Sequence, residues 1–139
     1  MLKIQDNLWH PFQSTLLQLL TQSLCPHCKE EYFPSREEAE KILTEPEDIE
    51  KFMQTKIYRA KGCKECDYLG YVGRLGIYEI MPMNKEIKKL IAIGAHDIEI
   101  EETAVACGMK TLNQSCLHHI LEGDTTVSEF IRVLGVVSE

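Results

Sequence analysis

The spacing of apolar side chains predicts a mostly helical chain with a short strand-rich stretch in its middle. Between Ser14 and Leu24 the leucines favour a helix with one broad apolar face. In Ser35–Leu43 and Thr44–Met53 the apolar residues recur three and four positions apart, which predicts two amphipathic helices. Residues 57–80 are instead rich in Gly and Tyr, a composition typical of short strands and turns.

Helical spacing returns beyond Pro82 and predicts four short helices that form a small bundle. Polar side chains suited to cap the N-termini of the predicted helices are Ser35, Thr44, Asn84, Asp97 and Thr126. The expected fold class is therefore α+β, mostly helical. The expected domains are an N-terminal segment with one helix (1–24), a cysteine-containing subdomain with the strand that follows it (25–82), and a C-terminal helical bundle (83–139).

Four of the six cysteines form two Cys-x-x-Cys pairs, namely Cys25 with Cys28 and Cys63 with Cys66. Two intervening residues let one turn direct both sulfurs at a single ion, so two such turns predict a closed tetrahedral zinc site. Four sulfur ligands leave no position for water or substrate, so we expect one structural Zn²⁺ per chain. Two redox-active pairs or an iron–sulfur site are the alternatives, although the βαβ context of a thioredoxin-like site is missing.

The remaining histidines and cysteines are expected to be structural or exposed. His27 lies inside the first cysteine turn and is interpreted as a surface residue. His118 and His119 are adjacent on a predicted helix, so they point in different directions, one to solvent and one into the packing. Cys107 and Cys116 occupy apolar positions and are predicted to be buried.

Composition and charge exclude several functions. The 139 residues include 22 acidic and 15 basic ones, a net charge of −7, which argues against phosphate-backbone binding as the main task. The sequence contains no G-x-x-x-x-G-K-[ST] motif and no local signature of a catalytic triad, so we expect no catalysis by this chain itself. Without a long apolar run or a secretory signal, the chain is expected to be cytoplasmic, with reduced cysteines.

One alternative reading is a free-standing tetracysteine zinc protein that binds nucleic acid or another protein. Such proteins carry basic and aromatic residues near their metal turns. A sparse set of this kind is present: Lys29, Tyr58, Arg59, Lys61, Lys64 and Tyr68. The overall acidity of the chain weighs against this reading.

Three stretches together resemble a known family. They are LCPHCK at 24–29, GCKECD at 62–67 running into GYVGRLGIYE at 70–79, and GMKTL at 108–112 followed by Gly123 and TTVSEFIRV at 125–133. In this order they resemble the C-terminal part of the assembly ATPases of bacterial type II secretion and type IV pilus systems. The similarity covers about residues 14–135, and the GCxxC…GYxGRxGIYE block is its most specific part.

The resemblance implies a function that composition alone does not. Enzymes of that family are hexameric, hydrolyse ATP and drive pilus or pseudopilus assembly at the cytoplasmic face of the inner membrane, and their four matching cysteines hold one zinc. Their nucleotide-binding core precedes the first cysteine pair. This chain is therefore expected to be a non-catalytic, zinc-stabilised interaction module that lacks the core and associates with the membrane only peripherally.

The resemblance also implies partners for the chain. We expect these to be the ATPase core, the neighbouring subunits of the hexamer and the inner-membrane platform protein, and we expect no nucleic acid among them. Interface candidates in the GRxGIYE stretch are Arg74, Ile77, Tyr78 and Glu79. The helix pair Ser35–Met53, which is rich in Glu and Asp, is the expected docking surface for a partner.

Overall fold

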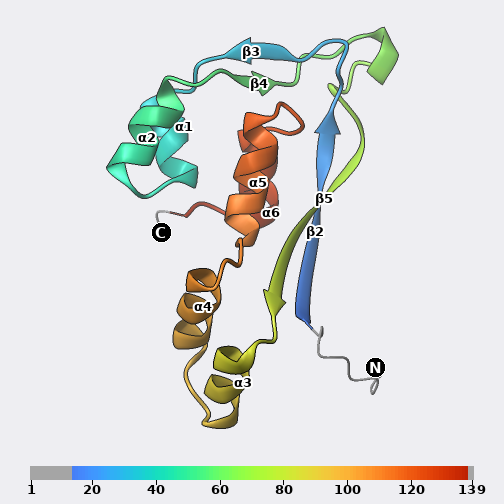
Figure 1. The fold of residues 1–139 in the computed structure, drawn as a ribbon. Helices are drawn as coiled ribbons and strands as arrows, with labels where there is room; N and C mark the ends of the chain where they lie inside the picture. Colours follow the sequence, from blue (N-terminus) through green and yellow to red (C-terminus); the bar gives the residue numbers. More distant parts are fainter. Residues whose placement is uncertain (1–13, 138–139) are drawn as a thin grey trace. The chain divides into compact units, whose positions relative to one another are not determined.

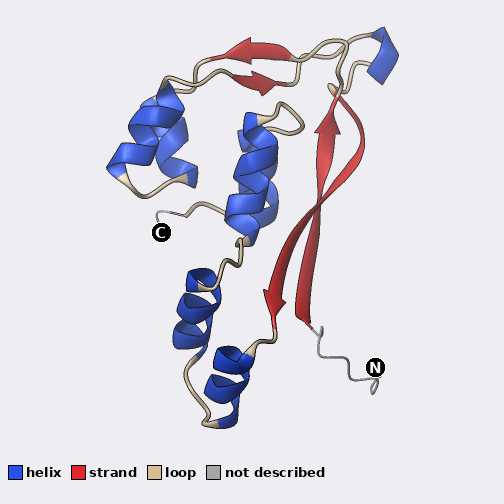
Figure 2. Ribbon diagram, in the orientation of Figure 1, coloured by secondary structure: helices blue, strands red, loops and turns tan. Residues whose placement is uncertain are grey.

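The computed structural model describes residues 14–137, except for the side chains of residues 14–16 and of Pro82. Its α+β, mostly helical architecture confirms the predicted fold class (Figures 1 and 2). The elements, in chain order, are β2 (Ser14–Leu24), β3 (Glu30–Tyr32), α1 (Arg36–Ile42), α2 (Pro46–Met53), β4 (Ile57–Arg59), the short 3₁₀ helix η1 (Lys64–Cys66), β5 (Tyr71–Pro82), α3 (Lys85–Ala92), α4 (Asp97–Ala106), α5 (Leu112–Leu121) and α6 (Val127–Leu134). The part of the predicted N-terminal segment before residue 14 lies outside the described residues.

The prediction of a helix over Ser14–Leu24 is wrong, because this segment forms strand β2. It pairs with β5, and Figure 1 shows that the two strands run in opposite directions. Exposure follows the two-residue period of a strand: Thr21 is buried while its neighbours Leu20 and Gln22 are exposed. Since an isolated helix of about three turns is marginal in water, pairing with a long strand satisfies the backbone of this segment better.

The chain divides into two compact units, and the division falls inside both long strands. Among the described residues, unit 1 comprises residues 14–17 together with Tyr78–Thr111, and unit 2 comprises Gln18–Ile77 together with residues 112–137. Helices α3 and α4 therefore belong to unit 1, whereas α5 and α6 belong to unit 2. The four helices are present as predicted, and α3 packs on α4 within unit 1 while α5 packs on α6 within unit 2.

Unit 2 holds the larger core. Helix α1 packs on α2 and α6, and α5 packs on α6 and on β4. Strands β3 and β4 form an antiparallel pair with Glu31 opposite Tyr58. The buried residues of this core are Ala39, Ile42, Ile49, Phe52, Ile57, Ile77, Cys116, Ile120, Val127 and Phe130. The core thus joins side chains from both sequence segments of unit 2.

Unit 1 has a small core between α3 and α4. Ile87, Ala104 and Met109 are its buried residues, and Met81 and Ile100 are among the partly buried side chains packed against them. Because burial of apolar area drives packing roughly in proportion to that area, this core stabilises its unit less than the core of unit 2 does.

Helix capping follows the sequence at three of the five predicted positions. The side chains of Ser35, Asn84 and Thr126 each accept a hydrogen bond from a backbone N–H of the first turn. Thr44 and Asp97 are not N-caps, because Glu45 and His96 hold those positions. Helix α2 begins with Pro at 46, whose fixed φ suits the first helical position, and this moves the cap to the residue before it.

Candidate metal centre

The four cysteines of the two Cys-x-x-Cys pairs come together at one end of unit 2. Their sulfur atoms all lie within 4.8 Å of one another. Cys25 follows directly after β2, and Cys28 closes the turn that comes next. Cys63 is the N-cap of η1, and Cys66 is its last residue. Two turns from distant parts of the sequence thus supply the four thiols, as the spacing predicted.

The distances between the sulfurs match a tetrahedral zinc site. The Cys25–Cys63 pair is separated by 3.7 Å, and the Cys28–Cys66 and Cys63–Cys66 pairs by 3.8 Å. Four sulfurs at ~2.3 Å from a central Zn²⁺ would stand ~3.8 Å apart. A disulfide requires ~2.05 Å, and all four cysteines are free thiols. Soft sulfur donors with this geometry suit Zn²⁺ and exclude hard cations such as Mg²⁺.

Backbone N–H groups surround the sulfurs and favour their ionised form. Gly62 donates to the Cys28 Sγ at 3.3 Å, and Cys63 and Gly70 each donate to the Cys66 Sγ at 3.2 Å. Burial opposes ionisation of the Cys66 thiol, but these two N–H donors, with Cys28 and Cys63, lower its pKa to about 6. The pKa of Cys63 is raised to about 11. Burial and the thiols of Cys28 and Cys25 raise it, and they outweigh the backbone N–H groups of Cys66 and Glu65, which lower it.

Two glycines allow the second cysteine turn to close. Gly62 has φ +110°, and a Cβ there would stand 2.8 Å from the carbonyl oxygen of Tyr68. Gly70 has φ +86°, and a Cβ there would stand 2.6 Å from the Cβ of Ala60. Both positions therefore require glycine on two grounds, the left-handed backbone and the lack of space. The position of Gly62 directly before the second cysteine pair is a signal in the sequence, whereas the need for glycine at Gly70 arises only in the folded chain.

Comparison with known proteins shows the family. The chain matches the family described as Type II/IV secretion system protein over residues 2–132, which is nearly its whole length. This chain belongs to that family. The resemblance seen in the sequence is thereby confirmed.

Three curated relatives illustrate the similarity. The type IV pilus assembly ATPase PilB of Myxococcus xanthus is 35% identical over 84% of this chain and 20% of its own length. PilB of Thermus thermophilus is 34% identical over 84% of this chain and 13% of its own length. The type II secretion system protein E of Pseudomonas aeruginosa is 36% identical over 85% of this chain and 22% of its own length. The chain thus spans about a fifth or less of the length of these three relatives.

The other candidate residues lie apart from the four thiols. His27 is exposed, as predicted. His118 is largely exposed, whereas His119 is mostly covered and bonds to Asp124 at 3.0 Å, which confirms the predicted division of roles. Cys116 is buried as expected, and burial raises the pKa of its thiol to about 12. The prediction for Cys107 is wrong: it is exposed, and it is the C-cap residue that follows α4 rather than part of the helix.

The interface candidates of the GRxGIYE stretch differ in how far their side chains are exposed to solvent. Arg74 and Tyr78 are exposed on β5, and Glu79 is half-buried. Ile77 is fully buried in the core of unit 2, so its side chain cannot contact a partner. This correction follows from strand alternation, which turns successive side chains to opposite faces.

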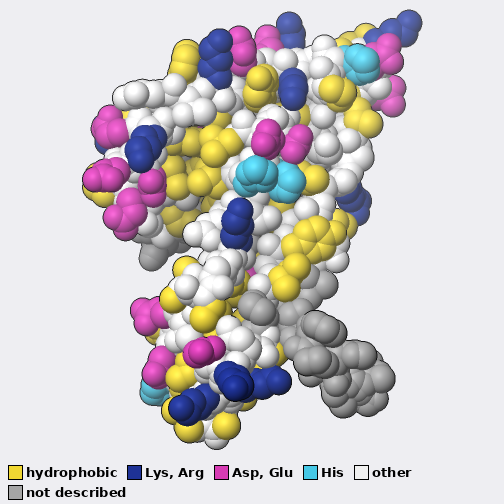
Figure 3. All heavy atoms as spheres, in the orientation of Figure 1, with side chains coloured by type: hydrophobic (Ala, Val, Ile, Leu, Met, Phe, Trp, Pro, Cys, Tyr) yellow, Lys and Arg dark blue, Asp and Glu magenta, His cyan; other side chains and the backbone are white. Residues whose placement is uncertain are grey.

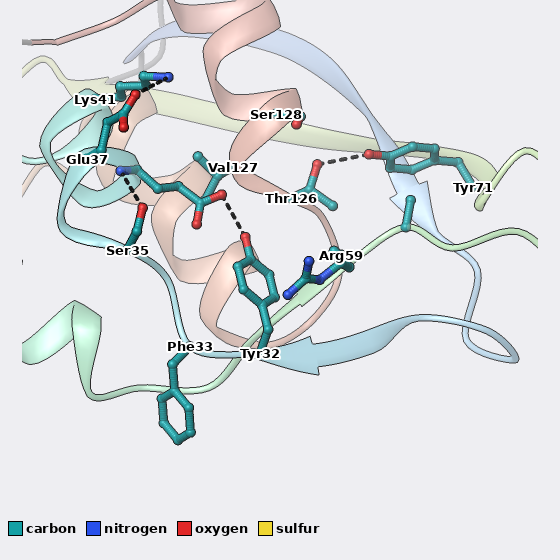
Figure 4. Close-up of a pocket in the computed structure, with 12 residues that line it drawn as sticks. Tyr32, Phe33, Ser35, Glu37, Lys41, Arg59, Tyr71, Thr126, Val127 and Ser128 are labelled. Carbon is teal, nitrogen blue, oxygen red and sulfur yellow. Dashed lines mark hydrogen bonds and ion pairs between the residues drawn. The ribbon is translucent and has the colours of Figure 1, made fainter.

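A polar pocket of about 580 Å³ lies at the base of α1 in unit 2 (Figure 4). The hydroxyl of Tyr32 donates to Glu38 at 2.7 Å, and the guanidinium of Arg59 lies over the Tyr32 ring at 3.9 Å. Burial is the main cause that raises the pKa of the Tyr32 hydroxyl, and the Glu38 carboxylate raises it further. These contacts tie α1 to the β3–β4 sheet, which leads directly into the cysteine turns. Nothing in the sequence marks these contacts, because Tyr32 has no distinguishing motif around it.

Within residues 14–137, none of the helices combines the length and the apolar character that crossing a bilayer requires.

Proposed function

We propose that this chain is a non-catalytic, zinc-stabilised interaction module of a type II secretion or type IV pilus assembly ATPase, which supports export or pilus assembly. The observation that carries the proposal is the set of four thiols at tetrahedral spacing in a member of this family. The curated relatives are named as assembly ATPases and as secretion proteins, and they extend well beyond the part that this chain matches. Nucleotide hydrolysis is accordingly assigned to a core outside these residues.

The proposed zinc has a structural role. Four sulfur ligands complete its coordination, so no position is left for a reacting water or substrate. The two ligand pairs flank the segment that holds β3, α1, α2 and β4, with 34 residues between them. A metal at this point fixes both ends of that segment, and the segment can then present a defined surface to another protein.

Metal analysis of the intact chain tests this proposal. Elemental analysis after purification under reducing conditions should find one zinc per chain. Chelation should release four thiols to a thiol reagent, while the reactivity of Cys107 should stay the same with and without the metal. Metal-free protein that retains its fold would contradict the proposed function.

The acidic helix face is the proposed docking surface. It comprises Glu37, Glu38, Glu40, Glu45, Glu47, Asp48 and Glu50 on α1, α2 and the residue between them, and Figure 3 shows acidic side chains gathered over these helices. Arg36 forms an ion pair with Glu50, and Lys41 lies 3.9 Å from Glu37. The remaining carboxylates leave an excess of negative charge, which suits a basic surface on the cytoplasmic domain of an inner-membrane platform protein.

Charge reversal on this face should weaken binding of that platform domain. The double variant Glu40→Lys/Glu45→Lys should raise the dissociation constant about tenfold, because attraction becomes repulsion across the interface. Both side chains are exposed, so zinc content and the thermal transition should change little. The matched control, Glu99→Lys/Glu102→Lys on α4, changes the net charge equally and should bind as the unmodified chain does. Equal binding by all three proteins, measured by titration calorimetry, would place the docking surface elsewhere.

A further inference from the structure

Unit 1 contains a pocket of about 250 Å³ that combines an apolar floor with a rim of carboxylates. Its apolar lining residues are Leu17, Met81, Ile91, Ile100 and Met109, and its acidic ones are Glu79, Asp97 and Glu101. All of them belong to unit 1. This set is called the acidic-rimmed pocket below.

The floor of the pocket is the open side of the unit 1 core. Met109 is buried, and Met81 and Ile100 pack against the core while remaining partly accessible. Ile91 is 45% exposed and Leu17 is 48% exposed at the edges. Methionine side chains are flexible and polarisable, so a floor built on two of them can adapt to an inserted apolar group.

The rim of the pocket is negative, and two of its three carboxylates lie on α4. Asp97, Ile100 and Glu101 are spaced three and four residues apart on α4, so they share one face of the helix. Within the described part of the chain, neither Asp97 nor Glu101 has an ion pair, and none of the residues lining the pocket is basic. Carboxylates placed close together repel one another, and a cation between them relieves that repulsion.

We infer that the acidic-rimmed pocket binds a lysine or arginine side chain from a basic amphipathic helix of a partner protein. The aliphatic stem of such a side chain lies on Met81, Ile100 and Met109, while its charged end reaches Asp97 and Glu101. Long basic side chains divide their apolar and charged parts in this way. A volume of about 250 Å³ is below the ~300–1,000 Å³ of pockets for drug-sized ligands, which favours a single side chain.

Neighbouring residues supply apolar contact for the rest of the helix. Ile98, next to Asp97 on α4, is 72% exposed, and Ile93 at the end of α3 is 71% exposed. Exposed isoleucines beside a pocket that selects a cation match the pattern of leucines and lysines on a basic amphipathic helix. The negative rim repels nucleic acid and anionic membrane surfaces, so a protein helix fits the charges better.

Methyl NMR of the intact chain locates the binding directly. The probe is a synthetic amphipathic helix built from leucine and lysine, and the matched control peptide has every lysine replaced by glutamate. With ¹³C-methyl methionine, the signals of Met81 and Met109 should shift on titration with the lysine peptide. The signal of Met53, which packs in the unit 2 core, should not move. Shifts at Met53 alone, or equal shifts with the glutamate peptide, would overturn the inference.

Matched charge-neutralising variants separate the pocket from general attraction to an acidic protein. Asp97→Asn/Glu101→Gln should weaken binding of the lysine peptide about tenfold, since the two carboxylates nearest the cation are lost. Glu99→Gln/Glu102→Gln removes the same charge from α4 outside the pocket lining and should change the affinity less than about twofold. All four side chains are exposed, so the fold should persist in both variants. Equal weakening in both would overturn the inference.

Discussion

Replacing Cys66 with serine should abolish zinc binding and the cooperative thermal transition of unit 2. Cys66 is the most constrained of the four proposed ligands: it is buried, and its sulfur accepts hydrogen bonds from the N–H groups of Cys63 and Gly70. A hydroxyl is a far poorer ligand for Zn²⁺ than a thiolate, and three ligands do not close the site.

The expected loss of stability is large because metal binding and folding are coupled. The binding free energy of a structural zinc is comparable with the whole stability of a small domain. The proposed metal would also join the turn after β2 to the turn after β4, so its loss would free both ends of the intervening segment. Zinc per chain and the thermal unfolding curve are the measurements.

A matched cysteine variant serves as control. Cys107→Ser changes a thiol of the same chain that is exposed and lies outside the four-thiol cluster. It should keep one zinc per chain and an unaltered unfolding curve. If Cys66→Ser retained zinc and Cys107→Ser lost it, the assignment of the ligands would be wrong.

Replacing Glu129 with alanine should lower the free energy of unfolding of unit 2 by about 2 kcal/mol. The buried carboxylate of Glu129 accepts a hydrogen bond from the backbone N–H of Gln22 at 2.6 Å, which joins α6 to β2 across 107 residues of sequence. Alanine would leave that N–H without its charged acceptor, and this loss accounts for most of the effect. The pairing with Arg132 contributes little, since the arginine is half-exposed.

The Glu129 effect should depend on pH in a defined direction. Hydrogen bonds from Arg132 lower the pKa of Glu129, against the opposing effect of burial, and the Gln22 N–H lowers it further. A carboxyl with a lowered folded-state pKa stabilises fully above its unfolded pKa of about 4.3 and loses that contribution as the pH falls through the folded value. The difference in unfolding free energy between the two proteins should therefore shrink in acid.

Denaturant unfolding of both proteins between neutral and acidic pH measures this difference. Acid protonates the proposed zinc ligands of both proteins alike, so the comparison isolates Glu129 over the pH range in which both proteins stay folded. Glu122→Ala, which removes an exposed carboxylate from the end of α5, should cost under about 0.5 kcal/mol. A difference for Glu129→Ala that stays constant down to the lowest pH would show that the charge of Glu129 is not what stabilises the contact.

The fold was predictable wherever local signals agree with the final packing. Ser35, Asn84 and Thr126 cap their helices because side-chain oxygen and first-turn N–H groups lie within three residues of each other. The segment that became β2 could not be predicted in this way. Its leucines satisfy helical spacing as well as strand spacing, and the choice depends on its partner strand, which begins 47 residues after β2 ends.

The convergence of the four cysteines was predictable, because each Cys-x-x-Cys spacing places two sulfurs in one turn. Its support was only partly predictable. Gly62 precedes a cysteine and was found, whereas Gly70 matters because it approaches Ala60 and donates to Cys66, and both contacts arise only in the folded chain. Glu129 is similar: the sequence marks it as part of a helix start, but its carboxylate reaches Gln22 instead.

Unit 2 is built from two separate stretches of sequence, and this affects how the chain folds during synthesis on the ribosome. Ile57 and Ile77 emerge early, but they pack in one core with Ile120 and Phe130, which are translated only after the whole of α3 and α4. The nascent chain can thus gather its four thiols around a metal well before its core can close. During that interval half of the core is exposed, and contacts so distant in sequence form slowly. A premature stop codon between residues 112 and 130 would therefore yield a chain with all four proposed zinc ligands but an incomplete core, a ready substrate for chaperones and proteases.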